Sequence, residues 1–179
     1  NRSPAKTQSA LFEVMEERQI TMDGKQYEMQ EPFLVVATQN PIEHEGTYRL
    51  PEAQLDRFLF KINVGYPNLS QEVEIIKNQH ENKLADKTDA VQKVISGTQL
   101  KNYQNLVKDV IVEKQLLEYI AKIIVNTREN QFLYLGASPR ASLALLTASK
   151  AFAAVRGRDF VTPEDIKEAS YAVLRHRVI

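Results

Sequence analysis

The sequence has 179 residues, which is enough for one domain with a sizeable core or for two small domains. Lys and Arg number 23, Asp and Glu also number 23, and this balance disfavours binding to nucleic acid or to an anionic membrane surface. The absence of cysteine excludes disulfides, thiolate metal ligands and a cysteine nucleophile. No apolar run reaches the roughly 18 residues that a membrane-spanning helix needs. We therefore expect a cytoplasmic protein that does not enter the membrane.

The first residues predict a helix followed by a β-hairpin. Ser3 and Pro4 suit the N-cap and the first position of a helix, and apolar residues at helical spacing extend it to Arg18. Beyond that helix, apolar residues alternate on both sides of Asp23-Gly24, a dipeptide that favours a two-residue hairpin turn. The hairpin tip is polar, so we expect it to be exposed.

Two apolar segments further along predict strands. Residues 33–38 (FLVVAT) show no polar alternation, which is typical of a strand buried on both faces of a parallel sheet. Residues 51–57 (PEAQLDR) predict a short helix, and residues 58–64 (FLFKINV) alternate as a second strand. Strand, helix and strand in this order indicate α/β architecture.

From Ser70 onward the pattern becomes helical. Ser70 is a suitable N-cap, because two glutamates follow it in the first turns. Further helices are predicted over 113–129, over 139–156 with Gly157 behind it, and from Thr162, where Pro163 and Asp165 complete a capping box. Residues 83–97 are expected to form a connection. We place a domain boundary between Tyr66 and Ser70, which gives an α/β plus all-α fold class with units 1–68 and 69–179.

Asn40 is the first candidate for a functional side chain. It ends the polar triplet Thr38-Gln39-Asn40, directly after the apolar segment. Open α/β sheets bind ligands beyond the carboxyl ends of their parallel strands, and an amide there can orient a water molecule or a phosphate oxygen. The alternative is a local turn in front of Pro41, which is a common arrangement.

Arg140 is the second candidate and stands in the segment GASPRAS. Ser138 suits the N-cap of a helix and Pro139 its first position, so Arg140 falls in the first turn. A cation there opposes the helix dipole. The same position can bind an anion, because free N–H groups and the guanidinium can converge on one phosphate. A pairing of Arg140 with a nearby carboxylate is equally compatible with the sequence.

Arg57 is the third candidate and lies between the predicted short helix and the strand that follows it. Arginine is always charged, and its planar fork suits phosphate oxygens, as in the arginine fingers of phosphoryl-transfer enzymes. The alternative is a surface pair between Arg57 and its neighbour Asp56.

Other chemistries find no support in the sequence. The three histidines lack metal-ligand spacing, so no metal site is predicted. No G-x-S-x-G segment occurs. The six glycines never cluster, so these residues hold no phosphate-cradling loop of the G-x-x-x-x-G-K-[ST] type.

Three stretches of the sequence are distinctive when they are taken together: NRSPAKTQSALFEVMEERQITMDG, FLVVATQNPIEHEGTYRLPEAQLDRFLFKI and GASPRAS. In this order they resemble the MoxR branch of the AAA+ ATPases, over essentially the whole chain. The resemblance implies that residues 1–68 are the C-terminal part of an AAA+ core, an incomplete αβα unit. It implies a helical lid domain for residues 69–179.

The resemblance also implies a catalytic role for each candidate. Asn40 falls on sensor 1, the polar residue that positions the attacking water beside the γ-phosphate. Arg57 falls on the arginine finger, which reaches into the ATP site of the neighbouring subunit. Arg140 falls on sensor 2, the lid arginine that contacts the γ-phosphate. Whether sensor 2 serves its own subunit or the neighbour stays open, since a related branch with a displaced lid uses it in trans.

The chain departs from the family pattern in one respect. The P-loop lysine and the acidic pair that holds magnesium have no counterpart in these residues, and we expect both ahead of Asn1. The resemblance therefore implies ATP and Mg²⁺ as cofactors of a longer parent protein. Because phosphoryl transfer depends on those parts, we expect no tight nucleotide binding and no hydrolysis by the 179 residues alone.

The function implied for the parent is ATP hydrolysis at the subunit interfaces of a ring, expected to be a homohexamer, to remodel or mature partner proteins. A client with a von Willebrand factor A domain is the expected kind of partner. The hairpin around Asp23-Gly24 is a candidate contact with that client. Two other functions stay open: a non-enzymatic helical interaction module, and a DNA-associated AAA+ motor, which the zero net charge disfavours.

Overall fold

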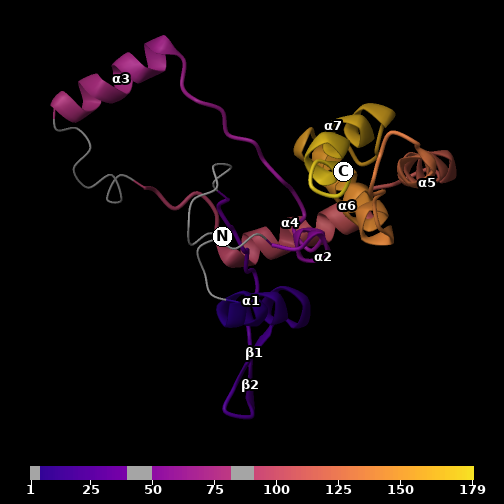
Figure 1. Ribbon diagram of the computed structural model, residues 1–179, viewed down its shortest axis with the longest axis horizontal. Helices are drawn as coiled ribbons and strands as arrows, with labels where there is room; N and C mark the ends of the chain where they lie inside the picture. Colours follow the sequence, from indigo (N-terminus) through magenta and orange to yellow (C-terminus); the bar gives the residue numbers. More distant parts are fainter. Residues whose placement is uncertain (1–4, 40–49, 82–90) are drawn as a thin grey trace.

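The computed structural model describes residues 5–39, 50–81 and 91–179. Helix α1 (Ala5–Glu17) leads into an antiparallel hairpin of β1 (Gln19–Met22) and β2 (Lys25–Glu28), as predicted. Figure 1 shows the hairpin projecting from α1, away from the cluster formed by the last helices. Asp23 and Gly24 both have positive φ, at 51° and 75°. This conformation gives the turn a twist that matches the two strands.

The prediction of strands at 33–38 and 58–64 is wrong. Neither segment belongs to a strand, and β1–β2 is the only sheet in the described ranges. Leu34 and Val64 are 83% and 91% exposed, so the apolar side chains expected in a core face outward. A strand is defined by its hydrogen bonds to a neighbouring strand, and no described segment forms a neighbouring strand here. The short helix between these segments, α2 (Glu52–Leu55), forms as predicted.

Five helices make up the second half of the described chain: α3 (Leu69–His80), α4 (Gly97–Asp109), α5 (Lys114–Glu129), α6 (Pro139–Val155) and α7 (Pro163–Leu174). The expected start of α3 is wrong by two residues, because Asn68 rather than Ser70 is its N-cap and forms a capping box with Gln71. Helix α4 was not predicted. Within these ranges no helix is long and apolar enough to cross a membrane.

The core lies among the last three helices, which Figure 1 shows gathered around the C-terminus. The buried residues that pack together there are Val110, Ile120, Leu145, Ala148, Ala153, Val161, Ile166, Ala169 and Val173. Helix α6 presents mainly small side chains to this core, and small residues let neighbouring helices approach closely. By contrast, α3 has no buried residue and stands apart from the cluster.

A buried carboxylate closes the turn between α6 and α7. Asp165 is fully buried and accepts hydrogen bonds from Arg156 at 2.7 Å and from both terminal nitrogens of Arg158 at 2.7 and 2.8 Å. It also accepts from the Thr162 backbone at 2.9 Å, which completes the predicted capping box. Burial alone raises the pKa of Asp165, but the hydrogen bonds from Arg158, Thr162 and Arg156 outweigh it and hold the pKa well below its usual range.

Candidate functional site

The side chains of Arg57 and Arg140, two of the three candidates, meet at the carboxylate of Glu16. Arg140, in the first turn of α6, donates through Nη2 to Glu16 Oε1 at 2.8 Å. Arg57, just after α2, pairs through Nη1 with the other oxygen of the same carboxylate. Glu16 itself lies in the last turn of α1. Three elements that are distant in the sequence therefore bring two guanidinium groups onto one anion.

Arg57 is held in a partly apolar setting. Its guanidinium carbon lies 5.7 Å from the centre of the Phe12 ring, a distance at which a cation and an aromatic face attract. Its Nε is buried and has no hydrogen-bond partner in the described ranges. The sequence left open a surface pair between Asp56 and Arg57, but the ion pair that Arg57 makes is with Glu16.

Arg140 is positioned by the start of α6. Ser138 is the N-cap, and its Oγ accepts from the Arg140 backbone N–H at 3.2 Å, while Pro139 occupies the first position, as predicted. The Arg140 side chain is 55% exposed, and its Nη1 lies 3.9 Å from Asp56 Oδ2. The carboxylate pairing that the sequence left open therefore forms, with Glu16 as its main partner.

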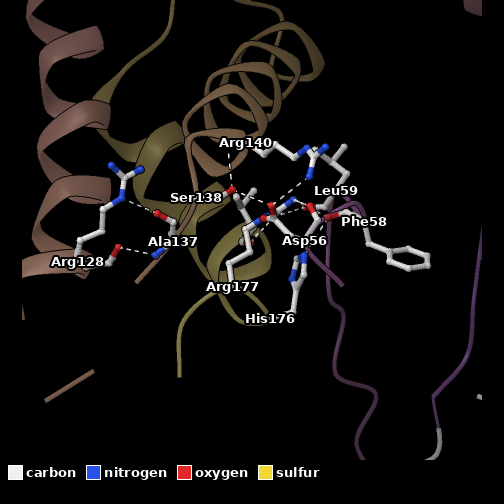
Figure 2. A network of polar contacts seen from close by, with 11 residues as sticks. Asp56, Phe58, Leu59, Arg128, Ala137, Ser138, Arg140, His176 and Arg177 are labelled. Carbon is white, nitrogen blue, oxygen red and sulfur yellow. Dashed lines mark hydrogen bonds and ion pairs between the residues drawn. The ribbon is translucent and has the colours of Figure 1, made fainter. Parts of the chain in front are cut away.

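The loop ahead of α6 is fastened to the end of α5. Arg128 Nε donates to the Ala137 carbonyl at 2.7 Å, as Figure 2 shows. The Ala137 N–H in turn donates to Thr127 Oγ1 at 2.9 Å. Gly136 is required here, because a Cβ would lie 2.6 Å from the Arg128 Cα and 2.7 Å from the Thr127 carbonyl oxygen. This close approach lies two residues ahead of Ser138, the N-cap of α6.

The segment after α7 reaches back to the loop that carries Arg57, as Figure 2 shows. His176 Nε2 contacts the Phe58 carbonyl at 2.9 Å, which requires a proton on that nitrogen. Burial lowers the pKa of His176, and the positive charge of Arg177 lowers it further. The hydrogen bond to Phe58 itself raises the pKa, but burial and Arg177 outweigh it and favour the neutral imidazole. Arg177 is almost fully buried beside it and pairs with Asp56 at 2.8 Å.

The structure brings together two of the residues proposed from the sequence and adds four that the sequence did not indicate. Arg57 and Arg140 were predicted from their local settings. Asn40 lies outside the described residues. The missed residues are Glu16, Asp56 in its actual role, His176 and Arg177. Nothing near them in the sequence marks them, because their partners come from other elements.

The meeting point of these side chains is a pocket of about 250 Å³. It is lined by Met15, Glu16, Asp56, Arg57, Leu59, Arg140, Ala144 and Arg177. The arginines on its wall suit phosphate oxygens. The described parts of the chain contain no cluster of three or more acidic or histidine side chains that could hold a metal ion.

Comparison with protein families agrees with this architecture. Residues 1–60 match the "ATPase family associated with various cellular activities (AAA)", and residues 125–179 match the "AAA lid domain". The first match covers the segment that carries Arg57, and the second covers the helices that carry Arg140. The fold is thus part of an AAA+ core followed by helices of an AAA lid.

Individual relatives give the branch of the family. The chain is 45% identical to the chaperone MoxR1 of Mycobacterium tuberculosis, across 100% of this chain and 48% of that protein. It is 42% identical to YeaC of Bacillus subtilis, across 100% of this chain and 55% of YeaC. The crystal structure of a candidate ATPase from Cytophaga hutchinsonii superposes with a TM-score of 0.89 at 41% identity, across 100% of this chain and 56% of that one. The chain thus spans about half the length of the relatives it matches, and it belongs to the MoxR family of AAA+ ATPases.

Proposed function

We propose that this chain forms part of a ring-shaped ATPase whose subunits hydrolyse ATP at their interfaces. One observation carries the proposal: the side chains of Arg57 and Arg140 meet at the carboxylate of Glu16. Carboxylate and phosphate both present oxygens that match the guanidinium fork. Two guanidinium groups that share a carboxylate are therefore spaced to share a phosphate group as well. Membership of the AAA+ family makes ATP the nucleotide that supplies it.

We propose Arg57 as the arginine finger that one subunit extends to the nucleotide of its neighbour. There it would stabilise the negative charge that spreads over the transferred phosphoryl group. Since Arg140 lies on the same carboxylate as Arg57, we propose that both arginines of one subunit serve the same nucleotide. Sensor 2 would then act in trans. A role for Arg140 in its own subunit would require the two arginines to separate.

The remaining parts of the site are assigned by the family resemblance. We propose Asn40 as sensor 1, whose side chain orients the attacking water. When bound, Mg²⁺–ATP supplies the phosphoryl group and the metal charge that offsets its negative charge. These 179 residues contain no P-loop sequence, so we propose that they neither bind ATP tightly nor hydrolyse it by themselves. Residues 1–68 would belong to the core and residues 69–179 to the lid.

The output proposed for the parent protein is the remodelling or maturation of a partner protein in the cytoplasm. The relative MoxR1 is named as a chaperone, which supports this output. A chain without cysteine fits a reducing compartment. We propose that identical subunits form a hexameric ring and that the partner contains a von Willebrand factor A domain. The exposed hairpin β1–β2 is the proposed contact with that partner.

The first experiment measures Mg-ATP turnover of the full-length parent at concentrations where rings form. Wild type is compared with Asn40→Ala, Arg57→Ala and Arg140→Ala, and nucleotide binding is measured for each. Arg18→Ala is the matched control, since Arg18 is an exposed arginine paired with Glu31 at the surface. Loss of turnover by about 100-fold or more with nucleotide binding retained supports the proposal. Unchanged turnover in the site variants contradicts it and favours a non-enzymatic interaction module.

A mixing experiment separates action within a subunit from action between subunits. A variant that lacks the P-loop lysine of the parent is mixed with Arg57→Ala, and in a second mixture with Arg140→Ala. Each partner is inactive alone, but a mixed ring contains interfaces with an intact P-loop on one side and intact arginines on the other. Recovery of turnover in both mixtures is the expected result. Recovery with Arg57→Ala but not with Arg140→Ala would place Arg140 in its own subunit's site.

A further inference from the structure

The guanidinium of Arg177 binds residues 56–59, the loop that contains Arg57, through several hydrogen bonds. Its side chain is 3% exposed. The guanidinium donates to the Asp56 carboxylate at 2.8 Å and to the backbone carbonyls of Asp56 at 2.9 Å, Phe58 at 2.6 Å, Leu59 at 3.1 Å and Val173 at 2.5 Å. A planar fork with several donors fixes the direction of each acceptor. The backbone from residue 56 to residue 59 is therefore held as one unit against the end of α7.

Asp56 extends this contact to the helix that carries sensor 2. Its second carboxylate oxygen accepts a hydrogen bond from Ser138 Oγ at 2.7 Å, and the same Oγ accepts from the backbone N–H of Arg140 at 3.2 Å. Figure 2 shows Asp56 close to both Arg177 and Ser138. One carboxylate thus joins the arginine-finger loop, the N-terminus of α6 and the segment that follows α7.

The lid has other contacts that hold its helices together. The helices α6 and α7 share a core that includes Leu145, Ile166 and Ala169, and Asp165 fastens the turn between them. These contacts lie apart from Asp56, which is 14% exposed at the junction of the two units. The cluster of Asp56, Ser138 and Arg177 joins the lid to the arginine-finger loop, whereas the core of the lid is formed without it.

We propose that Asp56 and Arg177 are positioning residues that keep Arg57 and Arg140 of one subunit at a fixed separation, so that both reach the same phosphate group. The proposal rests on the function proposed above for those two arginines. Arg57 follows Asp56 directly in the chain, and Arg140 begins the helix that Asp56 contacts through Ser138. A shift of about 1 Å in such a group can lower a rate about 100-fold. The clamp of Asp56 and Arg177 thus transmits lid position to the arginine finger.

The test compares Asp56→Asn and Arg177→Lys with Arg57→Ala in the full-length parent. Asparagine keeps the size of Asp56 and an acceptor for Ser138 but lacks the charge, and lysine cannot reproduce the fork of Arg177. Asp165→Asn is the matched control, because it breaks a buried carboxylate network of the lid that does not touch Asp56. We expect kcat to fall about 10- to 100-fold in the two clamp variants, with KM for ATP changed less than about threefold. The control should lose stability with kcat within about threefold of wild type.

Two further measurements separate positioning from a general loss of structure. If Asp56 acts in part through Arg57, Asp56→Asn should lower kcat clearly less in the Arg57→Ala background than in wild type, because effects of residues that act as a unit do not add. Hydrogen exchange of the parent without nucleotide should be faster across 138–141 and 57–61 in Asp56→Asn but not in Asp165→Asn. These two segments contain the Arg140 and Lys61 amides, which donate to Ser138 and Ala172.

The outcomes distinguish the clamp from the function on which it rests. Equal loss of kcat in Asp56→Asn and Asp165→Asn, or additive effects with Arg57→Ala, would overturn the positioning role while the arginine finger stands. Unchanged turnover in Arg57→Ala would instead overturn the proposed function, and the positioning role with it.

Discussion

Arg140 Nη2 lies 2.8 Å from Glu16 Oε1, although the two residues are 124 positions apart in the chain. The same carboxylate also pairs with Arg57. Glu16 thus occupies, within one subunit, the two guanidinium groups that we assign to the phosphate of the neighbour. A carboxylate in that place competes with phosphate oxygens for the same donors.

Removal of the charge on Glu16 should favour phosphate binding by the two arginines. In Glu16→Gln we expect the apparent KM of the parent for ATP to fall about two- to fivefold, which corresponds to about 0.5–1 kcal/mol for a partly exposed ion pair. The measurement is steady-state turnover against ATP concentration. Glu17→Gln, the same change at the adjacent exposed position, is the control and should leave KM unchanged. A higher KM in Glu16→Gln would show that Glu16 assists the arginines rather than competing for them.

Gly136→Ala should disturb the start of α6. The added Cβ would lie 2.6 Å from the Arg128 Cα, a backbone atom that cannot move without shifting α5. We expect a loss of about 1–3 kcal/mol in the free energy of unfolding, measured by chemical denaturation. Gly65→Ala is the control, because a Cβ at Gly65 meets nothing within 4 Å. Equal stability of the two variants would contradict the close approach at Gly136.

Asp165→Asn should destabilise the junction of α6 and α7. The substitution removes the charge from a fully buried carboxylate that accepts from Arg156 and Arg158, whose side chains are 39% and 25% exposed. Because Arg156 keeps its pair with Glu168, we expect a cost of about 1–3 kcal/mol. Because the folded pKa of Asp165 lies below the ordinary 3.8, its contribution is present above about pH 4 and is lost on further acidification. Chemical denaturation at neutral pH tests the first point. Glu164→Gln changes an exposed carboxylate next to it, and a similar loss there would contradict the assignment.

Stability should fall on mild acidification because of His176. Burial and the charge of Arg177 lower its folded pKa below the ordinary 6.5, so below that pH the unfolded chain binds a proton that the folded chain excludes. Asp56 and Lys61 are the other charged groups that act on it, and they do so in opposite directions. The free energy of unfolding therefore decreases as pH falls through 6.5, by at most about 1.4 kcal/mol per pH unit.

Denaturation of His176→Gln against wild type between about pH 7.5 and pH 5.5 tests this dependence. The glutamine amide can still donate to the Phe58 carbonyl but does not titrate in this range, so the slope should decrease. His80→Gln, at the exposed end of α3, should keep the wild-type slope. An undiminished slope in His176→Gln would assign the dependence to another group.

The hairpin should affect a partner without affecting basal turnover. Met22 and Tyr27 are 58% and 50% exposed on β1 and β2. Their joint replacement by serine should keep the ATPase rate of the parent within about twofold and abolish its stimulation by the partner, since large apolar side chains contribute most to an interface. The control replaces Thr21 and Gln26, a polar pair directly opposite each other in the same hairpin, by serine. Full stimulation of the Met22/Tyr27 variant would exclude the hairpin as the contact.

The sequence by itself determined the features that depend on a few neighbouring residues. The capping box of Thr162 and Asp165, the N-cap at Ser138 and the turn at Asp23-Gly24 all formed as predicted, because each is satisfied by hydrogen bonds or dihedral angles within about one turn of chain. The suitability of Arg57 and Arg140 for an anion was also visible, since it follows from the guanidinium and its local position.

Only the tertiary structure decided what lies next to these elements. The apolar segments 33–38 and 58–64 have the composition of strands, yet they join no sheet in the described structure, because a strand depends on a neighbouring strand and not on the segment itself. In the same way, the meeting of two arginines at Glu16 and the binding of Arg177 to the loop at Asp56 come from the packing of distant elements. Long-range contacts are set by the path of the whole chain, and no local pattern encodes them.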